Sequence, residues 1–220
     1  MPAPQPLDLA QAVELTRTGD LWLFRGRSGA DRAIQTFTNA PVNHVGMAVV
    51  LEDLPPLMWH AELGRSLTDV WSGEHRRGAQ LHDLAAAVTT WETRYHQRAW
   101  FRQLDPEVDR AGEDAILRTI ARMNGTPFPS TAGMVSRWVG SKKVVRALRR
   151  SERTQEAVAL ETAYCAEVVA ATYQAMGLLP NDRSPGWYDP GRFWSGDSLE
   201  LLGGNTLGDE IRVTVKVSEP

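Results

Sequence analysis

The chain has 220 residues, of which 42% are hydrophobic and 23% are charged, and it contains one cysteine. This composition is typical of one globular domain that buries its core without disulfides or metals. A single cysteine cannot form an internal disulfide, which favours a reducing, cytoplasmic location. The net charge of -3 argues against a protein that coats nucleic acid. Neither a signal peptide nor a membrane span is recognisable.

The predicted elements alternate short strands with helices of mixed length, which favours an α+β fold over a regular parallel array. In the first half the pattern predicts a helix over 7–17, a strand over 21–26, a helix over 30–38, and strands over 44–51 and 57–63. In the second half it predicts a strand over 98–104, a helix over 106–123, a loop and helix over 126–141, a helix over 164–176 and a strand over 210–217. We expect one domain over 1–220, with 1–18 as an extension and 126–160 as a helical insertion.

The segment from Lys142 to Arg153 combines a short apolar stripe with many basic side chains, which predicts an amphipathic helix. Such helices are most often solvated surface elements, and some contact anionic lipid headgroups. The apolar stripe is too short for a strong anchor. We therefore expect at most a weak contact with a membrane surface at this segment.

Cys165 lies where the sequence predicts the first turn of a helix. Unpaired N–H groups and the helix dipole stabilise a thiolate at that position, and the thiolate is the nucleophilic form of cysteine. The alternative is a buried structural thiol, since free cysteine is among the most buried residue types. The helix-start position makes Cys165 a candidate nucleophile beside that alternative.

Two predicted strands carry the polar residues that a catalytic thiol needs. His44 begins an apolar strand, while His60 and Glu62 share one face of the next strand because side chains alternate along a strand. His44 can take the thiol proton, and either His60 or Glu62 can orient its ring. The alternatives are a core histidine for His44 and a surface pair for His60 and Glu62.

The other histidines, His75, His82 and His96, lie in polar stretches without the close spacing of zinc ligands. Nucleotide-binding loops and the Gly-x-Ser-x-Gly elbow are also missing. We therefore expect neither a metal site nor a cofactor. The eight tryptophans are spread along the chain, as core residues are, so no nucleic-acid partner is expected either.

Three motifs together resemble the circularly permuted branch of the NlpC-type papain-like cysteine hydrolases, also called the YiiX-like group. They are Gly-Asp ahead of the first strand at 19–20, a His-x-Gly strand at 44–46, and Tyr-Cys-Ala-Glu-Val-Val at 164–169. Their order, with histidine before cysteine, is that of the family, and the resemblance spans residues 19–179. The sequence departs from the family at His60, which aligns with the usual glutamate, and at Ala166, where the family often has serine.

The resemblance implies a papain-like fold in which a small antiparallel sheet or half-barrel packs against the helix that carries the cysteine. It also implies a hydrolase or acyltransferase that acts on an amide or ester bond through a thioester intermediate. Cys165 would be the nucleophile, His44 the base, and His60 or Glu62 the third catalytic residue.

The substrate implied is a small molecule, peptide or lipid with an amide or ester bond. Tyr164, Trp187 and Tyr188 are the aromatic residues expected to line its pocket, and the alternative is that they only pack in the core. Two other functions fit the same residues. One is a non-catalytic binding module of the same fold, and the other is a sensor that uses reversible oxidation of the thiol.

Overall fold

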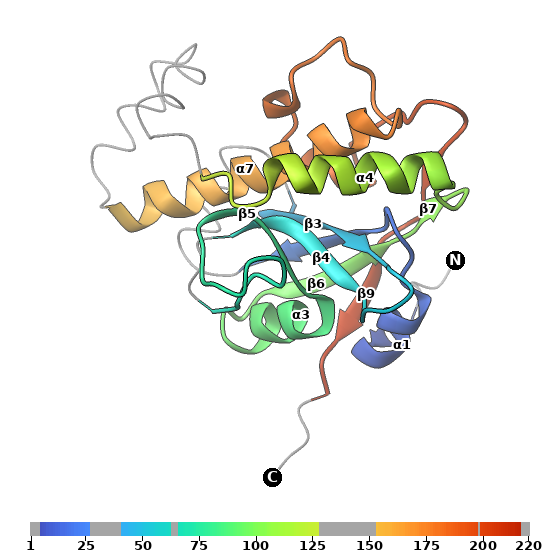
Figure 1. The fold of residues 1–220 in the computed structure, drawn as a ribbon. Helices are drawn as coiled ribbons and strands as arrows, with labels where there is room; N and C mark the ends of the chain where they lie inside the picture. Colours follow the sequence, from blue (N-terminus) through green and yellow to red (C-terminus); the bar gives the residue numbers. More distant parts are fainter. Residues whose placement is uncertain (1–4, 27–40, 63–65, 128–152, 198, 217–220) are drawn as a thin grey trace.

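In the computed structural model the described residues are 5–26, 41–62, 66–127, 153–197 and 199–216, with only the backbone described for 153–163. They form a seven-stranded sheet that lies between two layers of helices (Figure 1). This arrangement is mixed α+β, which confirms the fold class at that level. None of the helices among the described residues is long and apolar enough to span a membrane.

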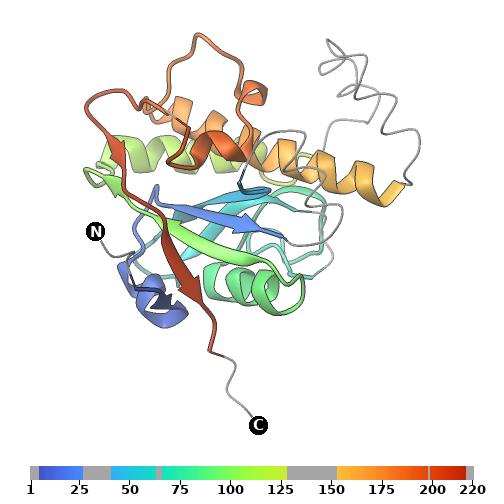
Figure 2. The ribbon, with the colours of Figure 1, turned by 180° about the vertical axis from the view of Figure 1, so that it is seen from behind.

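The sheet has the strand order β1-β9-β6-β2-β3-β4-β5. Its strands are β1 (Leu7–Asp8), β2 (Leu21–Arg25), β3 (His44–Val49), β4 (Leu57–Glu62), β5 (Gly78–Asp83), β6 (Arg98–Arg102) and β9 (Ile211–Thr214). Neighbours are antiparallel except β1 and β9, which are parallel. Strands β7 (Leu104–Asp105) and β8 (Thr206–Leu207) form a separate pair. Seen from behind, strand β9 runs beside β6 (Figure 2), and β1 pairs with its other side.

Helices cover both faces of the sheet. One face is covered by α7 (Arg153–Ala175) and α4 (Arg110–Met123), and the other by α3 (Leu84–Thr93) and α1 (Leu9–Leu15) (Figure 1). Two short 3-10 helices, η1 (Pro185–Trp187) and η2 (Pro190–Phe193), follow α7. Since both faces are covered, the central strands β2, β3 and β4 are almost fully buried.

The side chains of the central strands alternate between two apolar cores. The α7-side core includes Leu21, Leu23, Val45, Met47, Val49, Leu57, Trp59, Ala61, Leu81, Cys165, Val168, Val169 and Tyr173. The α3-side core includes Trp22, Phe24, Ala48, Met58, Leu84, Val88, Trp91 and Phe101. Trp59 confirms that the first group of side chains faces α7, because its indole N–H donates to Thr172 Oγ1 on that helix at 3.0 Å.

The predicted strands over 21–26, 44–51, 57–63, 98–104 and 210–217 are present as β2, β3, β4, β6 and β9, with ends one to three residues shorter in most cases. The helix over 106–123 starts at Arg110, because Asp109 caps it through the Gly112 N–H. The predicted helix over 30–38 lies outside the described residues, as do most of 126–141 and all of the basic segment except Arg153, the first residue of α7. The N-terminal helix is shorter than predicted, since Leu7–Asp8 forms β1.

One prediction about the second half was wrong. Helix α7 begins at Arg153, not at Tyr164. The physical reason is visible in the sequence: residues 153–163 contain neither glycine nor proline and are rich in alanine, glutamate and glutamine, so nothing stops the helix before Tyr164. Strand β5 and helix α3 were not predicted, although Asp83 has the position of a helix cap and Leu84, Ala87, Val88 and Trp91 have helical spacing.

The Gly-Asp motif ahead of β2 joins three parts of the fold. The buried Asp20 carboxylate accepts the backbone N–H of Arg17 at 2.7 Å and that of Leu104 at 2.8 Å. Gly19 adopts a φ of 93°, a conformation that favours glycine, and its carbonyl accepts the Tyr173 hydroxyl of α7 at 2.6 Å. The motif therefore ties α7 to the sheet.

Stability should depend on pH through Asp20. Burial raises the pKa of Asp20 from its ordinary value of 3.8 to about 6, against the effect of its two N–H partners. Between these two values the folded protein binds more protons than the unfolded chain, so this group lowers stability as pH rises, by roughly 3 kcal/mol across the window. Asp20→Asn removes this titration. As pH rises from 4 to 6.5, we therefore expect its free energy of unfolding, measured in urea, to increase by that amount relative to that of wild type. The exposed Asp53→Asn is the control, and parallel curves for wild type and Asp20→Asn would contradict the prediction.

Candidate functional site

Three histidines form a continuous series of hydrogen bonds on the α3 side of the sheet. His44 Nε2 lies 3.0 Å from His60 Nδ1, and His60 Nε2 lies 2.8 Å from His82 Nδ1. At the far end, His82 Nε2 lies 3.7 Å from Glu62 Oε2. We call these four residues the histidine chain. The structure thus brings together three residues that the sequence selects, His44, His60 and Glu62, and adds His82.

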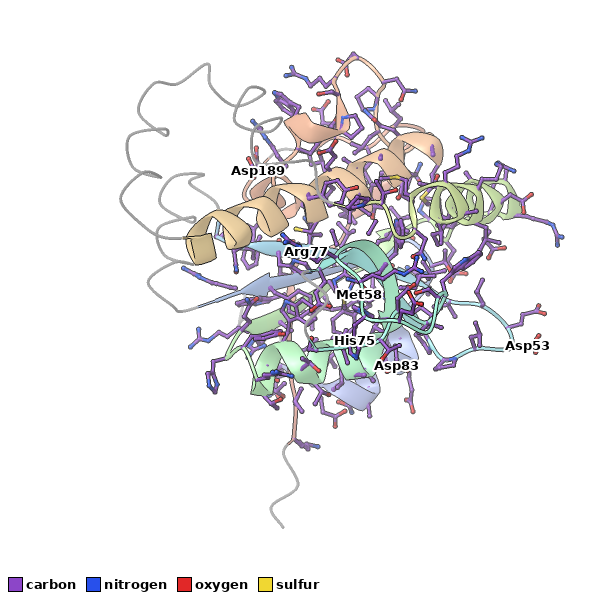
Figure 3. All side chains as sticks on the ribbon, turned by 60° about the vertical axis from the view of Figure 1, so that its left-hand side comes forward. Asp53, Met58, His75, Arg77, Asp83 and Asp189 are labelled. Carbon is purple, nitrogen blue, oxygen red and sulfur yellow. The ribbon has the colours of Figure 1, made fainter. Side chains whose placement is uncertain are left out.

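Strand pairing explains why these side chains meet. His44 lies on β3, His60 and Glu62 on β4, and His82 on β5, and the three strands are adjacent in the sheet. His82 pairs with Met58, so it shares the sheet face of Met58, His60 and Glu62. Figure 3 shows the sheet between α7 and α3, with Met58 and Asp83 on the side of α3 and Asp189 beyond α7.

Gly46 of the His-x-Gly motif makes room for this arrangement. It lies on the same face as His44, and a Cβ at this position would lie 2.8 Å from Met58 Cγ and 3.3 Å from His60 Cβ. Contacts that short force a neighbouring side chain to move. The glycine is therefore a packing requirement of the histidine chain.

The rings are enclosed by aromatic side chains. Trp91 of α3 lies 5.2 Å from both His44 and His60 between ring centroids, and Phe24 lies 5.7 Å from His44. His44 is 2% exposed and His60 is completely buried. The histidine chain is thus a polar group inside the α3-side core.

Burial sets the protonation state of the three rings. It lowers the pKa of His44 to about 3 and that of His82 to about 4, and it lowers the pKa of His60 well below 6.5. Desolvation is the main cause for each ring, because it penalises the charged imidazolium. All three rings are therefore neutral at pH 7.

Cys165 lies on the other face of the sheet. It is completely buried in the α7-side core, together with Val45 and Ala61, whereas His44 lies against Phe24 and Trp91 of the α3-side core. The sheet itself separates the sulfur from the imidazoles. The structure does not bring Cys165 into the histidine chain.

The helix-start argument for Cys165 is also wrong in this structure. Because α7 begins at Arg153, Cys165 lies in the helix interior, where its N–H takes part in the helical ladder. The field of an N-terminus falls off within the first turn, so it does not act on Cys165. For the same reason the Cys165 N–H is not a donor for an oxyanion.

The aromatic residues expected to line a pocket lie on the α7 side. Tyr164 and Tyr188 are each 4% exposed and belong to the α7-side core. Trp187 is 40% exposed, and its ring lies between the guanidinium groups of Arg183 and Arg192, at 4.0 and 4.2 Å from the centroid. These three residues are therefore near the face of Cys165, not near the histidine chain.

His82 is the site residue that sequence reasoning missed, because it was assigned to a polar stretch. The signal that identifies it is alternation: Ala79 and Leu81 are apolar, while Gln80 and His82 are polar, in a run that starts at a glycine. This pattern predicts a strand with His82 on the polar face. Which histidines that face would meet depends on the pairing of β5 with β4.

Within the described ranges, no group of three or more His, Cys, Asp or Glu residues is arranged to hold a metal ion. The side chains of the histidine chain are also not arranged around a common metal position. Each inner ring nitrogen is engaged by the next ring at hydrogen-bond distance, so its lone pair or proton is already used.

No protein-family model matches this chain, and no curated protein sequence does. A search of solved structures finds similarity to the crystal structure of the metalloprotein YiiX from Escherichia coli O157:H7. The identity is 20% and the TM-score is 0.44, over 72% of this chain and 64% of YiiX. The match thus covers slightly less than two thirds of the length of YiiX.

We expect Gly46→Ala to destabilise the protein by about 1–3 kcal/mol, the usual effect of overpacking a buried site. The added methyl group must displace Met58 or the backbone that carries His60. Chemical denaturation measures the stability, and histidine ring NMR signals report the displacement. Gly208→Ala is the control for a glycine-to-alanine change without crowding, since its φ is not positive either and a Cβ there lies 3.6 Å from the nearest atom. Unchanged stability and ring signals in Gly46→Ala would contradict the packing role.

The histidine chain should make the protein sensitive to acid. The pKa of each ring is lower in the folded state than its ordinary value of 6.5, so the unfolded chain binds more protons below that pH. The contribution of the three neutral rings to stability is therefore fully present above pH 6.5 and is lost as pH decreases. Near pH 5.5 the net loss of stability is roughly 3 kcal/mol per pH unit, once the opposite contribution of Asp20 is subtracted. Urea unfolding at pH 7, 6 and 5 measures this slope. The prediction fails if stability is flat from pH 7 to pH 5.

Proposed function

We propose that this chain is a hydrolase or acyltransferase that acts on an amide or ester bond, with His44 as its base. The observation that supports the proposal is the 3.0 Å hydrogen bond between His44 and His60. His44 is the residue that the motif resemblance implies as the base, and His60 is one of the two residues, with Glu62, that it offers to orient the ring. A base whose ring is oriented by a second polar residue is the arrangement that nucleophilic catalysis uses.

The proposed nucleophile is Cys165, which would form a thioester with the acyl group. Attack requires its sulfur to reach the hydrogen-bonding range of His44. In the described arrangement the two residues face opposite sides of the sheet. The proposal of Cys165 as the nucleophile therefore rests on the motif resemblance and not on this arrangement.

The substrate class follows from the same proposal. A peptide or a lipid with an amide or ester bond supplies the acyl group, and water or an amine accepts it. Trp187 is the member of the proposed aromatic pocket with substantial exposure, so it is the one available for direct contact with a substrate. The two flanking guanidinium groups favour substrates with an anionic group near the acyl chain.

The second candidate function is a non-catalytic binding module of the same fold. The complete burial of Cys165 in a helix interior favours it, because a structural thiol has this environment. The same burial counts against a redox sensor, since oxidation requires an accessible thiolate.

An electrophilic acyl probe separates the two candidates. If the chain is a hydrolase, the probe labels folded wild type at pH 7, Cys165→Ser is not labelled, and His44→Ala is labelled about 100-fold more slowly. His96→Asn, an exposed change that keeps the left-handed backbone accessible, is the matched control. If the chain is a binding module, labelling occurs at the rate of global unfolding and His44→Ala changes it only through stability. That second result would overturn the proposed function.

A further inference from the structure

We propose that the histidine chain is a proton relay whose direction is set by Glu62, with His82 as the positioning residue that connects Glu62 to His60 and His44. In this arrangement Nδ1 of His44 carries the lone pair that accepts a proton. The inference rests on the proposed function for the role of His44 as a base. It adds a residue, His82, and a terminal proton acceptor, Glu62.

The geometry allows the neutral chain only two states. A neutral imidazole has one N–H and one lone pair, and each N···N contact needs one of each. If His44 donates from Nε2, then His60 must donate from Nε2 to His82, and His82 must carry its own proton on Nε2. In the alternative state all three rings carry the proton on Nδ1. The three tautomers therefore change together.

Glu62 distinguishes the two states. His82 Nε2 lies 3.7 Å from Glu62 Oε2, and both side chains are almost completely buried. A carboxylate oxygen attracts an N–H and repels a nitrogen lone pair, and the low dielectric of the interior strengthens both effects. The state with all protons on Nε2 is therefore favoured, and it leaves Nδ1 of His44 unprotonated.

The other charged groups that act on His82 do not reverse this preference. Burial is the main influence on the pKa of His82, Asp69 acts in the opposite direction to burial, and His75 acts in the same direction. Asp69 has its own donors: the N–H groups of Leu81 and Ser72, the Ser72 hydroxyl, and the Asn124 amide. The charge of Asp69 favours a proton on the His82 ring, and the 3.7 Å contact with Glu62 is the one that distinguishes Nε2 from Nδ1.

The relay moves one proton without creating a buried imidazolium. A reactant S–H or O–H gives its proton to His44 Nδ1, and His44 passes its Nε2 proton to His60 Nδ1. His60 passes its Nε2 proton to His82 Nδ1. His82 then passes its Nε2 proton to the Glu62 carboxylate, a step that requires the 3.7 Å contact to shorten to hydrogen-bond length. The reactant becomes an anion and Glu62 becomes a neutral acid, so the net charge is unchanged. This route suits a base whose burial disfavours the charged ring.

Long-range ¹H–¹⁵N NMR of the histidine rings at pH 7 tests the relay without any activity measurement. The expected spectrum has His44, His60 and His82 all neutral with the proton on Nε2, and single-histidine variants assign the signals. A spectrum with any of these rings protonated on Nδ1, or with a charged ring, would overturn the proposal. His96→Asn is the control that should leave the three sets of signals unchanged.

Two variants of His82 test its positioning role. In His82→Asn the amide oxygen can replace Nδ1 as the acceptor for His60, so His60 and His44 should keep the proton on Nε2. In His82→Leu that acceptor is lost, and both rings should shift toward a mixture of tautomers. Unchanged tautomers in His82→Leu would show that His82 has no positioning role. If His82→Leu does not fold, the wild-type spectrum alone decides.

The relay and the proposed function fail in different ways. Rings with all protons on Nε2, in a protein that no acyl probe labels, would support the relay geometry and reject the hydrolase. Probe labelling that depends on His44, with rings protonated on Nδ1, would support the hydrolase and reject the relay. In the second case His44 would act as a base without Glu62.

Discussion

Side-chain alternation along β3 and β4 is the constraint on which the rest of the structure depends. Each residue of these central strands faces either α7 or α3, because the strands are buried on both sides. Val45 and Trp59 face α7, and their neighbours His44 and His60 face α3. One geometric rule therefore both assembles the histidine chain and separates it from Cys165.

The histidine chain shows how a protein can bury several titratable groups in one apolar layer. Neutral rings satisfy one another through N–H···N bonds, so burying them does not leave their inner nitrogens unpaired. The arrangement depends on close packing, which Gly46 and Trp91 provide from the sheet and from α3. A network of this kind holds a unique geometry, and it also makes stability dependent on pH.

Two of the motifs that carry the family resemblance have a structural role in this chain, and the cysteine of the third lies in the core. Gly19 and Asp20 tie the sheet to α7 and β7, Gly46 makes room for His60, and Cys165 packs in the α7-side core. Such roles preserve a fold whether or not the site is catalytic.

The sequence by itself determined the α+β class, most strands, and the shared face of His60 and Glu62, because strand periodicity is a local property. The early start of α7 also has a local cause, the uninterrupted run of helix formers over residues 153–163, so the sequence carried this signal although the prediction began the helix at the motif. Only the tertiary structure decided that His82 joins His60 and that Cys165 faces the other core. Those two outcomes depend on which strands pair and on which face of the sheet each helix covers, and neither is encoded within one segment of the chain.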